Sequence, residues 1–102
     1  KKETDYIWFK ITLLFATGEM EKLLKKHKNN CHAAARDLGN ENYRPFISQS
    51  IIGAAGKIKG ADRSGNKKNI FNDENHIKTV VNYCKEKRIT MCEDFKKYLP
   101  EE

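Results

Sequence analysis

The sequence predicts a single, mainly α-helical domain of five to six helices over residues 1–102. Apolar residues recur three and four positions apart in several separate segments, which is the spacing of one helix face. The length suits one domain and not two. No run approaches the ~18 apolar residues that a membrane span needs. The chain begins at Lys1 without a methionine, so we expect it to be part of a longer protein.

Two helical segments are predicted before residue 30. In the first, one face carries Ile7, Ile11, Leu14 and Phe15, with Trp8 beside it. Phe9 lies off that face and is expected to be only partly covered. The second segment repeats at the same spacing, through Met20, Leu23, Leu24 and His27. We interpret His27 as a partly buried side chain near the helix C-terminus, not as a metal ligand.

Two short helices that meet at a sharp turn are predicted next. An alanine-rich segment, 31–38, ends at Gly39, because glycine readily accepts the left-handed conformation that ends a helix. A polar turn, 40–42, leads into a second helix over 43–52, with Pro45 in its first turn. The inner face of that helix carries Phe46, Ile47, Ser50 and Ile51. This arrangement is typical of a helix-turn-helix, whose second helix enters the DNA major groove.

A basic segment follows, and it allows two interpretations. Residues 57–68 carry five positive charges, Lys57, Lys59, Arg63, Lys67 and Lys68, against Asp62. In the first interpretation, residues 57–59 and 69–71 pair as short strands and residues 60–68 form a wing. In the second, residues 57–68 are a flexible basic loop, because a hairpin this short is marginal on its own.

The last third of the chain predicts two more helices. The first carries an apolar face made of Ile77, Val80, Val81 and Cys84. A short final helix carries Phe95, Tyr98 and Leu99. Across the whole chain we expect these side chains to be mostly buried: Trp8, Leu14, Phe15, Leu23, Leu24, Leu38, Phe46, Ile47, Ile51, Val80 and Val81.

The charge balance favours a polyanionic partner. Lysine and arginine exceed aspartate and glutamate by six, and the isoelectric point is about 9.3. The alternative is that the lysines only keep the domain soluble. The candidate DNA contacts are the polar residues of the turn and second helix together with the basic segment: Asn40, Asn42, Tyr43, Arg44, Ser48, Gln49, Lys57, Lys59, Arg63, Lys67 and Lys68.

These candidates have different expected roles. Arg44, Ser48 and Gln49 avoid the apolar face and are expected to contact base edges or the DNA backbone. Asn40 and Asn42 are expected to bond phosphates at the start of the helix. The lysines and Arg63 act as point charges on phosphates. The alternative for Arg44 is an ion pair with Glu41 or Asp37 that only stabilises the turn.

We expect no enzymatic activity, no cofactor and no metal. The sequence has neither of the common phosphate-binding glycine patterns and no distinctive pair of carboxylates. Its three cysteines, Cys31, Cys84 and Cys92, do not combine with His27 or His32 at a zinc-site spacing. An odd cysteine count without a signal peptide predicts reduced thiols and a cytoplasmic protein.

Two resemblances point to DNA binding. The pattern N-x3-A-A-x2-L-G, at Asn30, Ala34, Ala35, Leu38 and Gly39, resembles the helix-turn-helix of the factor-for-inversion-stimulation type. With the following helix it covers about a fifth of the chain. The sequence departs from that pattern after Gly39, since Phe46 and Ile47 fall one place later and Pro45 stands at an apolar position.

A second resemblance covers more of the chain and is less specific. The layout of Trp8, the run LLFATGEM, Leu38-Gly39, residues 42–46, Lys68 and Ile70-Phe71 is similar to the winged-helix part of RteC-type regulators of conjugative transposons. This resemblance implies a DNA-binding regulatory domain.

The sequence therefore predicts a DNA-binding module of a transcriptional or mobile-element regulator, acting on double-stranded DNA. The alternative is a helical protein–protein adaptor without nucleic-acid binding. An adaptor needs an exposed apolar patch, for which Phe9, Tyr43 and Tyr98 are the candidates.

Overall fold

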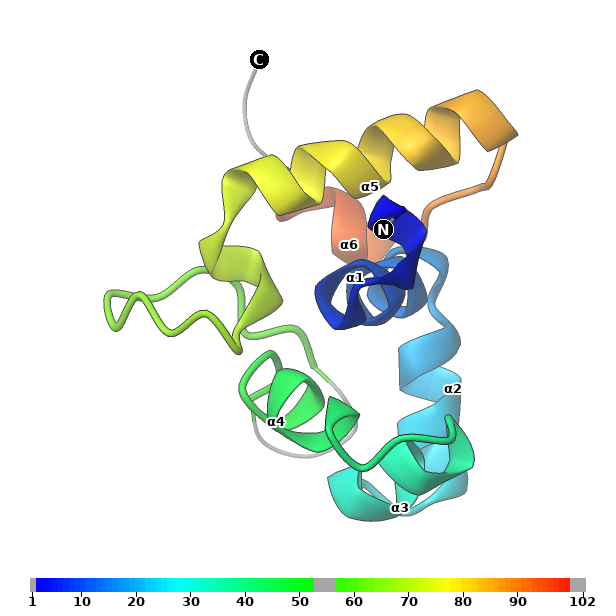
Figure 1. Cartoon of the computed structure of the whole chain (residues 1–102), viewed down its shortest axis with the longest axis vertical. Coiled ribbons are helices and arrows are strands. Elements are labelled where there is room, and N and C mark those ends of the chain that lie inside the picture. Colours follow the sequence, from blue (N-terminus) through cyan, green and yellow to red (C-terminus); the bar gives the residue numbers. More distant parts are fainter. Residues whose placement is uncertain (1, 53–56, 100–102) are drawn as a thin grey trace.

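The computed structural model describes residues 2–52 and 57–99 (Figure 1). Within these ranges the chain forms six α-helices and two 3-10 turns, which confirms the prediction of a mainly α domain. The α-helices are α1 (Ile7–Thr17), α2 (Glu19–Lys26), α3 (Cys31–Asp37), α4 (Tyr43–Ser48), α5 (Glu74–Lys87) and α6 (Glu93–Lys96). The 3-10 turns are η1 (Glu3–Asp5) and η2 (Ile70–Asn72). None of the described helices is long and apolar enough to cross a membrane.

Helix α1 is the centre of the fold. It contacts α2, α4, α5 and α6, and Figure 1 shows it end-on between α5 and α4. A helix that is contacted on several sides has to be apolar on more than one face. Phe9 is accordingly buried, with 2% of its surface exposed, so the prediction that it is only partly covered was wrong. Its ring packs edge-on against Tyr83, with the ring centroids 5.1 Å apart.

The predicted core residues all lie in or against the core. Five of them are buried, namely Phe15, Leu24, Ile47, Val80 and Val81. The other six are partly buried and pack against this cluster: Trp8, Leu14, Leu23, Leu38, Phe46 and Ile51. Cys84 is also fully buried, as its position on the apolar face of α5 predicted.

Side-chain caps begin two of the helices. The Asn30 carbonyl oxygen accepts a hydrogen bond from the Ala33 amide at the start of α3, at 3.1 Å. Asp73 accepts from the His76 amide at the start of α5, also at 3.1 Å. Such caps satisfy amides that have no partner inside the helix. His27 follows the last residue of α2 and is partly buried, as predicted.

A tight turn joins α3 to α4. Gly39 takes the left-handed conformation, with φ of +93°, and its amide donates to the Arg36 carbonyl at 2.9 Å. The Asn40 amide donates to the Ala35 carbonyl at 3.1 Å. This pair of bonds is the Schellman arrangement, which satisfies the last carbonyls of a helix. The two helices contact each other, and Ala34 and Ala35 are fully buried.

The chain after α4 differs from the prediction. The helix ends at Ser48 and not at residue 52. Ile51 instead forms an isolated antiparallel bridge with Ile58. The Ile52 amide donates to the Lys57 carbonyl and the Lys59 amide to the Ser50 carbonyl, each at 2.9 Å.

The predicted pairing of residues 57–59 with 69–71 was therefore wrong. Ile58 takes its partner from the segment before it, and residues 70–72 form η2. The cause is Asn69, whose side-chain oxygen accepts from the Phe71 amide at 3.0 Å. Asparagine side chains compete in this way with strand hydrogen bonds. The segment Gly60–Lys68 projects from the body as a loop beside α4 (Figure 1).

Candidate nucleic-acid interface

Two of the predicted contact residues are exposed on α4 and at its C-terminal end. Arg44 and Gln49 are exposed, and Ser48 is partly buried. The Ser48 hydroxyl donates to the Pro45 carbonyl at 3.4 Å, so it is turned toward its own helix. The Gln49 side-chain oxygen accepts from the Asn66 amide group at 3.3 Å, which links α4 to the basic loop.

Two predicted contact residues have structural roles instead. Tyr43 is 8% exposed and belongs to the core, so its assignment to the outer surface was wrong. It lies one helical turn before Ile47, and the two side chains therefore share the buried face of α4. The Asn40 side-chain oxygen accepts from the Asn42 amide at 2.9 Å, and this bond belongs to the turn. Asn42 remains exposed.

The basic loop is shaped by a network of short polar side chains around Asp62. The Asp62 carboxylate accepts hydrogen bonds from Ser64 and Asn72 and pairs with Lys59, whose Nζ lies 3.1 Å away. These interactions hold the pKa of Asp62 far below its usual value, and the hydrogen bond from Ser64 has the largest effect. Asn72 also bonds the Asp62 amide and the Asn66 carbonyl. The segment is thus a loop, as in the second interpretation, and it has hydrogen bonds of its own.

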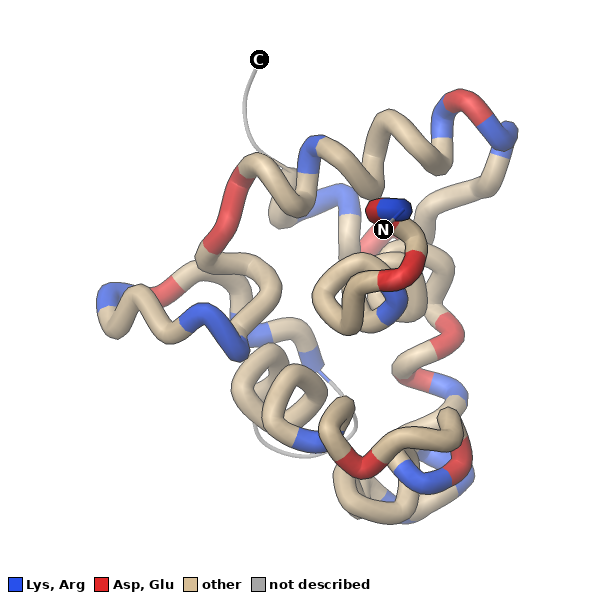
Figure 2. The backbone as a smooth tube through the Cα atoms, viewed as in Figure 1, with Lys and Arg blue, Asp and Glu red and all other residues tan. Residues whose placement is uncertain are grey.

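The five cations of residues 57–68 do not act as one group. Lys68 lies over the Phe46 ring of α4, with its Nζ 4.4 Å from the ring centroid, which is a cation–π contact. Lys67 and Arg63 are exposed and form no ion pair within the described residues. Lys59 pairs with Asp62, and Lys57 faces a different hollow. Figure 2 shows the positive stretch before η2 beside α4.

A hollow of about 530 Å³ opens beside the start of α4, and we call it the α4 hollow. Its wall is formed by Ile7, His32, Glu41, Asn42, Arg44, Pro45, Phe46 and Lys68. Arg44 forms no ion pair within the described residues, so the predicted alternative of a bond to Glu41 or Asp37 does not occur there. The hollow thus combines two cations, a carboxylate, a histidine, an amide and an aromatic ring.

A second hollow, the α3 hollow, lies next to the first. Its volume is about 470 Å³, and it is lined by Lys26, His27, Asn30, His32, Ala33, Arg36 and Asp37. The Asp37 carboxylate accepts from His27 at 2.9 Å and from Lys26 at 3.2 Å. These two contacts lower the pKa of Asp37, and the hydrogen bond with His27 has the larger effect.

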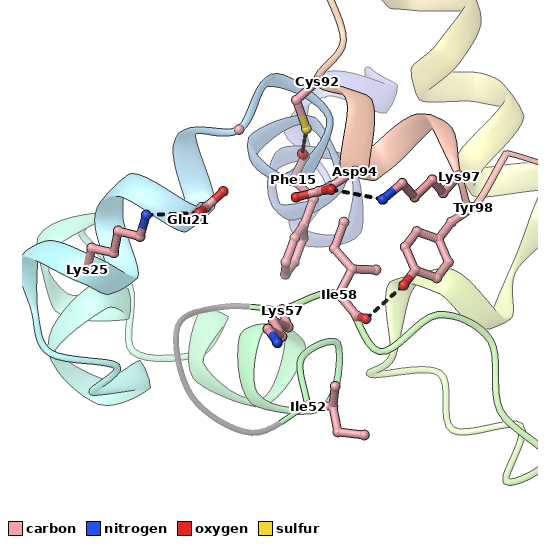
Figure 3. A pocket seen from close by; sticks show the side chains of 11 residues that line it. Phe15, Glu21, Lys25, Ile52, Lys57, Ile58, Cys92, Asp94, Lys97 and Tyr98 are labelled. Atoms are coloured by element: carbon pink, nitrogen blue, oxygen red, sulfur yellow. Dashed lines mark hydrogen bonds and ion pairs between the residues drawn. The ribbon is translucent and has the colours of Figure 1, made fainter.

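A third hollow, the α6 hollow, has a different character (Figure 3). It measures about 490 Å³ and is lined by Phe15, Gly18, Glu21, Lys25, Ile52, Lys57, Ile58, Cys92, Asp94, Lys97 and Tyr98. Its two acidic residues are paired with lysines, Glu21 with Lys25 at 3.0 Å and Asp94 with Lys97 at 3.5 Å. The Tyr98 hydroxyl donates to the Ile58 carbonyl at 3.2 Å.

The three cysteines are free thiols. Burial raises the pKa of Cys84, and burial also raises that of Cys31 against the opposing effect of Arg44. The Cys92 thiol donates to the Phe15 carbonyl at 3.4 Å. Among the residues that the structure describes, no three or more His, Cys, Asp or Glu side chains form a group able to hold a metal ion.

The structure adds residues that the sequence prediction did not include. His32 lines both the α4 and the α3 hollow, and Phe46 forms the floor under Lys68. His32 stands on α3 one turn before Arg36, and its helical spacing to Arg36 was the available signal. Phe46 was assigned only to the core. Asn66 is the third addition, because it joins the loop to Gln49.

Comparisons with known proteins assign no identity to this site. No family model, curated protein or solved structure matches the chain.

Proposed function

We propose that this domain binds double-stranded DNA through the α4 hollow and the loop that carries Arg63, Lys67 and Lys68. The observation that carries the proposal is the meeting of Arg44 and Lys68 in one hollow. The two cations come from segments 24 positions apart, and neither forms an ion pair within the part of the chain that is described. Cations without an internal counter-ion are free to contact phosphates.

The geometry of α4 supports this reading. The helix has six residues and therefore spans roughly 9 Å, and it follows directly on the turn from α3. The major groove of DNA, about 12 Å wide, admits an α-helix, whose diameter with side chains is about 10–12 Å. Arg44 lies in its first turn, where the recognition helix of a helix-turn-helix contacts base edges. The Gln49 side-chain oxygen accepts a hydrogen bond from Asn66. Its amide N–H groups donate to no described residue and are available to a base or a phosphate.

The regulatory role is part of the same proposal. A compact basic domain with a short helix and a loop beside it suits a transcriptional or mobile-element regulator. The antiparallel contact between Ile51 and Ile58 comes directly after α4, where winged-helix proteins place their wing. Lys57 and Ile52 flank this contact and give it one charged and one apolar side chain.

A protein–protein adaptor is the second candidate, and the α6 hollow is the observation that favours it. Ile52 is 59% exposed and Tyr98 is 40% exposed at this hollow. Of the three aromatic residues first considered for such a patch, Phe9 and Tyr43 are buried, which leaves Tyr98. Ile52 and Tyr98, two of the three exposed large hydrophobic side chains among the described residues, thus lie at a hollow different from the one that holds Arg44 and Lys68.

A fluorescence-anisotropy titration with a labelled mixed-sequence duplex distinguishes the two candidates. We expect binding at low salt, with an affinity that falls steeply as salt rises, because each phosphate contact releases a counter-ion. A protein without affinity for any duplex at low salt would rule out the DNA-binding proposal and favour the adaptor.

A further inference from the structure

The α4 hollow and the α3 hollow are neighbours, because His32 belongs to the wall of both. Each contributes two permanently charged cations, Arg44 and Lys68 on one side and Lys26 and Arg36 on the other. Together they form a basic surface longer than the one assigned to α4 and its loop. His32 and Arg36 were not among the predicted contacts.

One carboxylate stands at the junction of the two hollows. The Glu41 Oε1 atom lies 3.6 Å from the His32 Nε2 atom and 3.7 Å from the Arg36 Nε atom. Glu41 lines the α4 hollow, whereas Arg36 lines the α3 hollow. A single oxygen therefore lies between a histidine that lines both hollows and an arginine that lines the α3 hollow.

Both contacts are of a kind that a ligand can replace. The side chains of Glu41 and Arg36 are 65% and 67% exposed, and that of His32 is 49% exposed. Exposed ion pairs contribute little to stability, since water competes for both charges. A phosphate oxygen offers the same acceptor chemistry as a carboxylate oxygen, and guanidinium groups bind it at least as well.

We propose that the phosphate backbone of the bound DNA crosses both hollows, and that one phosphate takes the place of Glu41 between His32 and Arg36. This inference rests on the proposed DNA-binding function. Glu41 is then an internal competitor of the DNA phosphate, because in the free protein its carboxylate lies beside the His32 ring and the Arg36 guanidinium. Asp37 differs from Glu41, because its two contacts are hydrogen bonds, at 2.9 Å to His27 and 3.2 Å to Lys26. Both are shorter than the 3.6 Å and 3.7 Å contacts of Glu41.

The test is the substitution Glu41→Gln, with Glu86→Gln as a matched control. Both variants raise the net charge by one, and Glu86 is an exposed residue of α5 outside the three hollows. We expect Glu41→Gln to bind a labelled duplex about threefold or more tightly than the wild type at low salt, and Glu86→Gln to change affinity clearly less. Thermal melts of both variants check that the fold is unchanged.

A double-mutant cycle tests whether the effect of Glu41→Gln depends on Arg36. The gain from Glu41→Gln should shrink when Arg36 is replaced by alanine, because the released cation is then missing. Equal gains in Glu41→Gln and Glu86→Gln, with a wild type that binds and an Arg44→Ala variant that binds weakly, would overturn the inference and leave the proposed function standing. A wild type that binds no duplex would contradict both the inference and the proposed function.

Discussion

Two buried polar side chains, Ser50 and Asn69, organise residues 57–72, because Ser50 joins this segment to α4 and Asn69 bonds within it. The Ser50 hydroxyl donates to the Phe46 carbonyl at 2.6 Å and accepts from the Ile70 amide at 3.0 Å. The Asn69 amide group donates to the Gly60 carbonyl at 2.9 Å. Both side chains are essentially inaccessible to water. The position of the basic loop beside α4 thus depends on individual hydrogen bonds at single residues.

Replacing Ser50 by alanine should destabilise the domain by about 1–3 kcal/mol, because it leaves the buried Ile70 amide without its acceptor. Urea denaturation followed by circular dichroism measures the change. Ser48→Ala is the control, since that hydroxyl makes only a long bond within its own helix and should cost less than about 0.5 kcal/mol. Equal losses in the two variants would show that Ser50 does not have this role.

Asp62 gives the loop a defined response to pH. Its pKa in the folded protein is depressed, so its contribution to stability is present above the unfolded pKa of about 4 and is lost as the pH falls through the folded pKa. We therefore expect wild type to be more stable than Asp62→Asn at about pH 6, and this difference to shrink steadily below about pH 4. Thermal melts across that range provide the measurement. A constant difference between the two proteins would contradict the assigned network.

At the scale of elements, the contact between α3 and α4 fixes where the candidate site stands. Ala35 is fully buried on α3, which packs against α4. Ala35→Leu should overpack this contact and lower the free energy of unfolding by about 1–3 kcal/mol. Ala33→Leu, on a partly buried position of the same helix, should cost clearly less. Melts in which Ala35→Leu is as stable as wild type would mean that the two helices are not closely packed.

The helices were predictable because their signal is periodic and local. Apolar spacing located α1, α2 and α5, and Gly39 marked the end of α3. The segment after α4 was not predictable in the same way. Its arrangement depends on which distant partners Ser50 and Asn69 reach, and such partners leave no periodic pattern in the sequence.

The same distinction applies to the candidate site. Arg44 and Gln49 were assigned correctly to the exposed surface, because the apolar face of α4 fixes which side chains point away from it. The prediction for Tyr43 was wrong, since an aromatic side chain in the first turn of a helix can be either exposed or buried. The separation of Lys57 from Lys68 was also unpredicted, because it follows from the contact between Ile51 and Ile58.

At the scale of the whole molecule, the positive charge is unevenly matched by acids. Ion pairs occupy Lys22, Lys25, Lys26, Arg36, Lys59, Lys96 and Lys97. Arg44, Lys67 and Lys68 form none within the described residues, and they lie on or beside the α4 surface. Lys85 and Lys87 also form no ion pair with any residue in 2–52 or 57–99, and they stand at the end of α5, where the helix dipole favours positive charge. The pair Arg44 and Lys68 and the pair Lys85 and Lys87 each carry two positive charges in different places, so they can be compared directly.

The most direct test of DNA binding at the α4 hollow compares two double variants, Arg44→Ala/Lys68→Ala and Lys85→Ala/Lys87→Ala. Each removes two positive charges, and anisotropy titrations of a labelled duplex over a series of salt concentrations measure their affinities. We predict that the first variant loses about tenfold or more in affinity at low salt and that its salt slope falls by about two, because two phosphate contacts are lost. The second should stay close to wild type. Equal losses in both variants would mean that only net charge matters, and would contradict the assignment of the site.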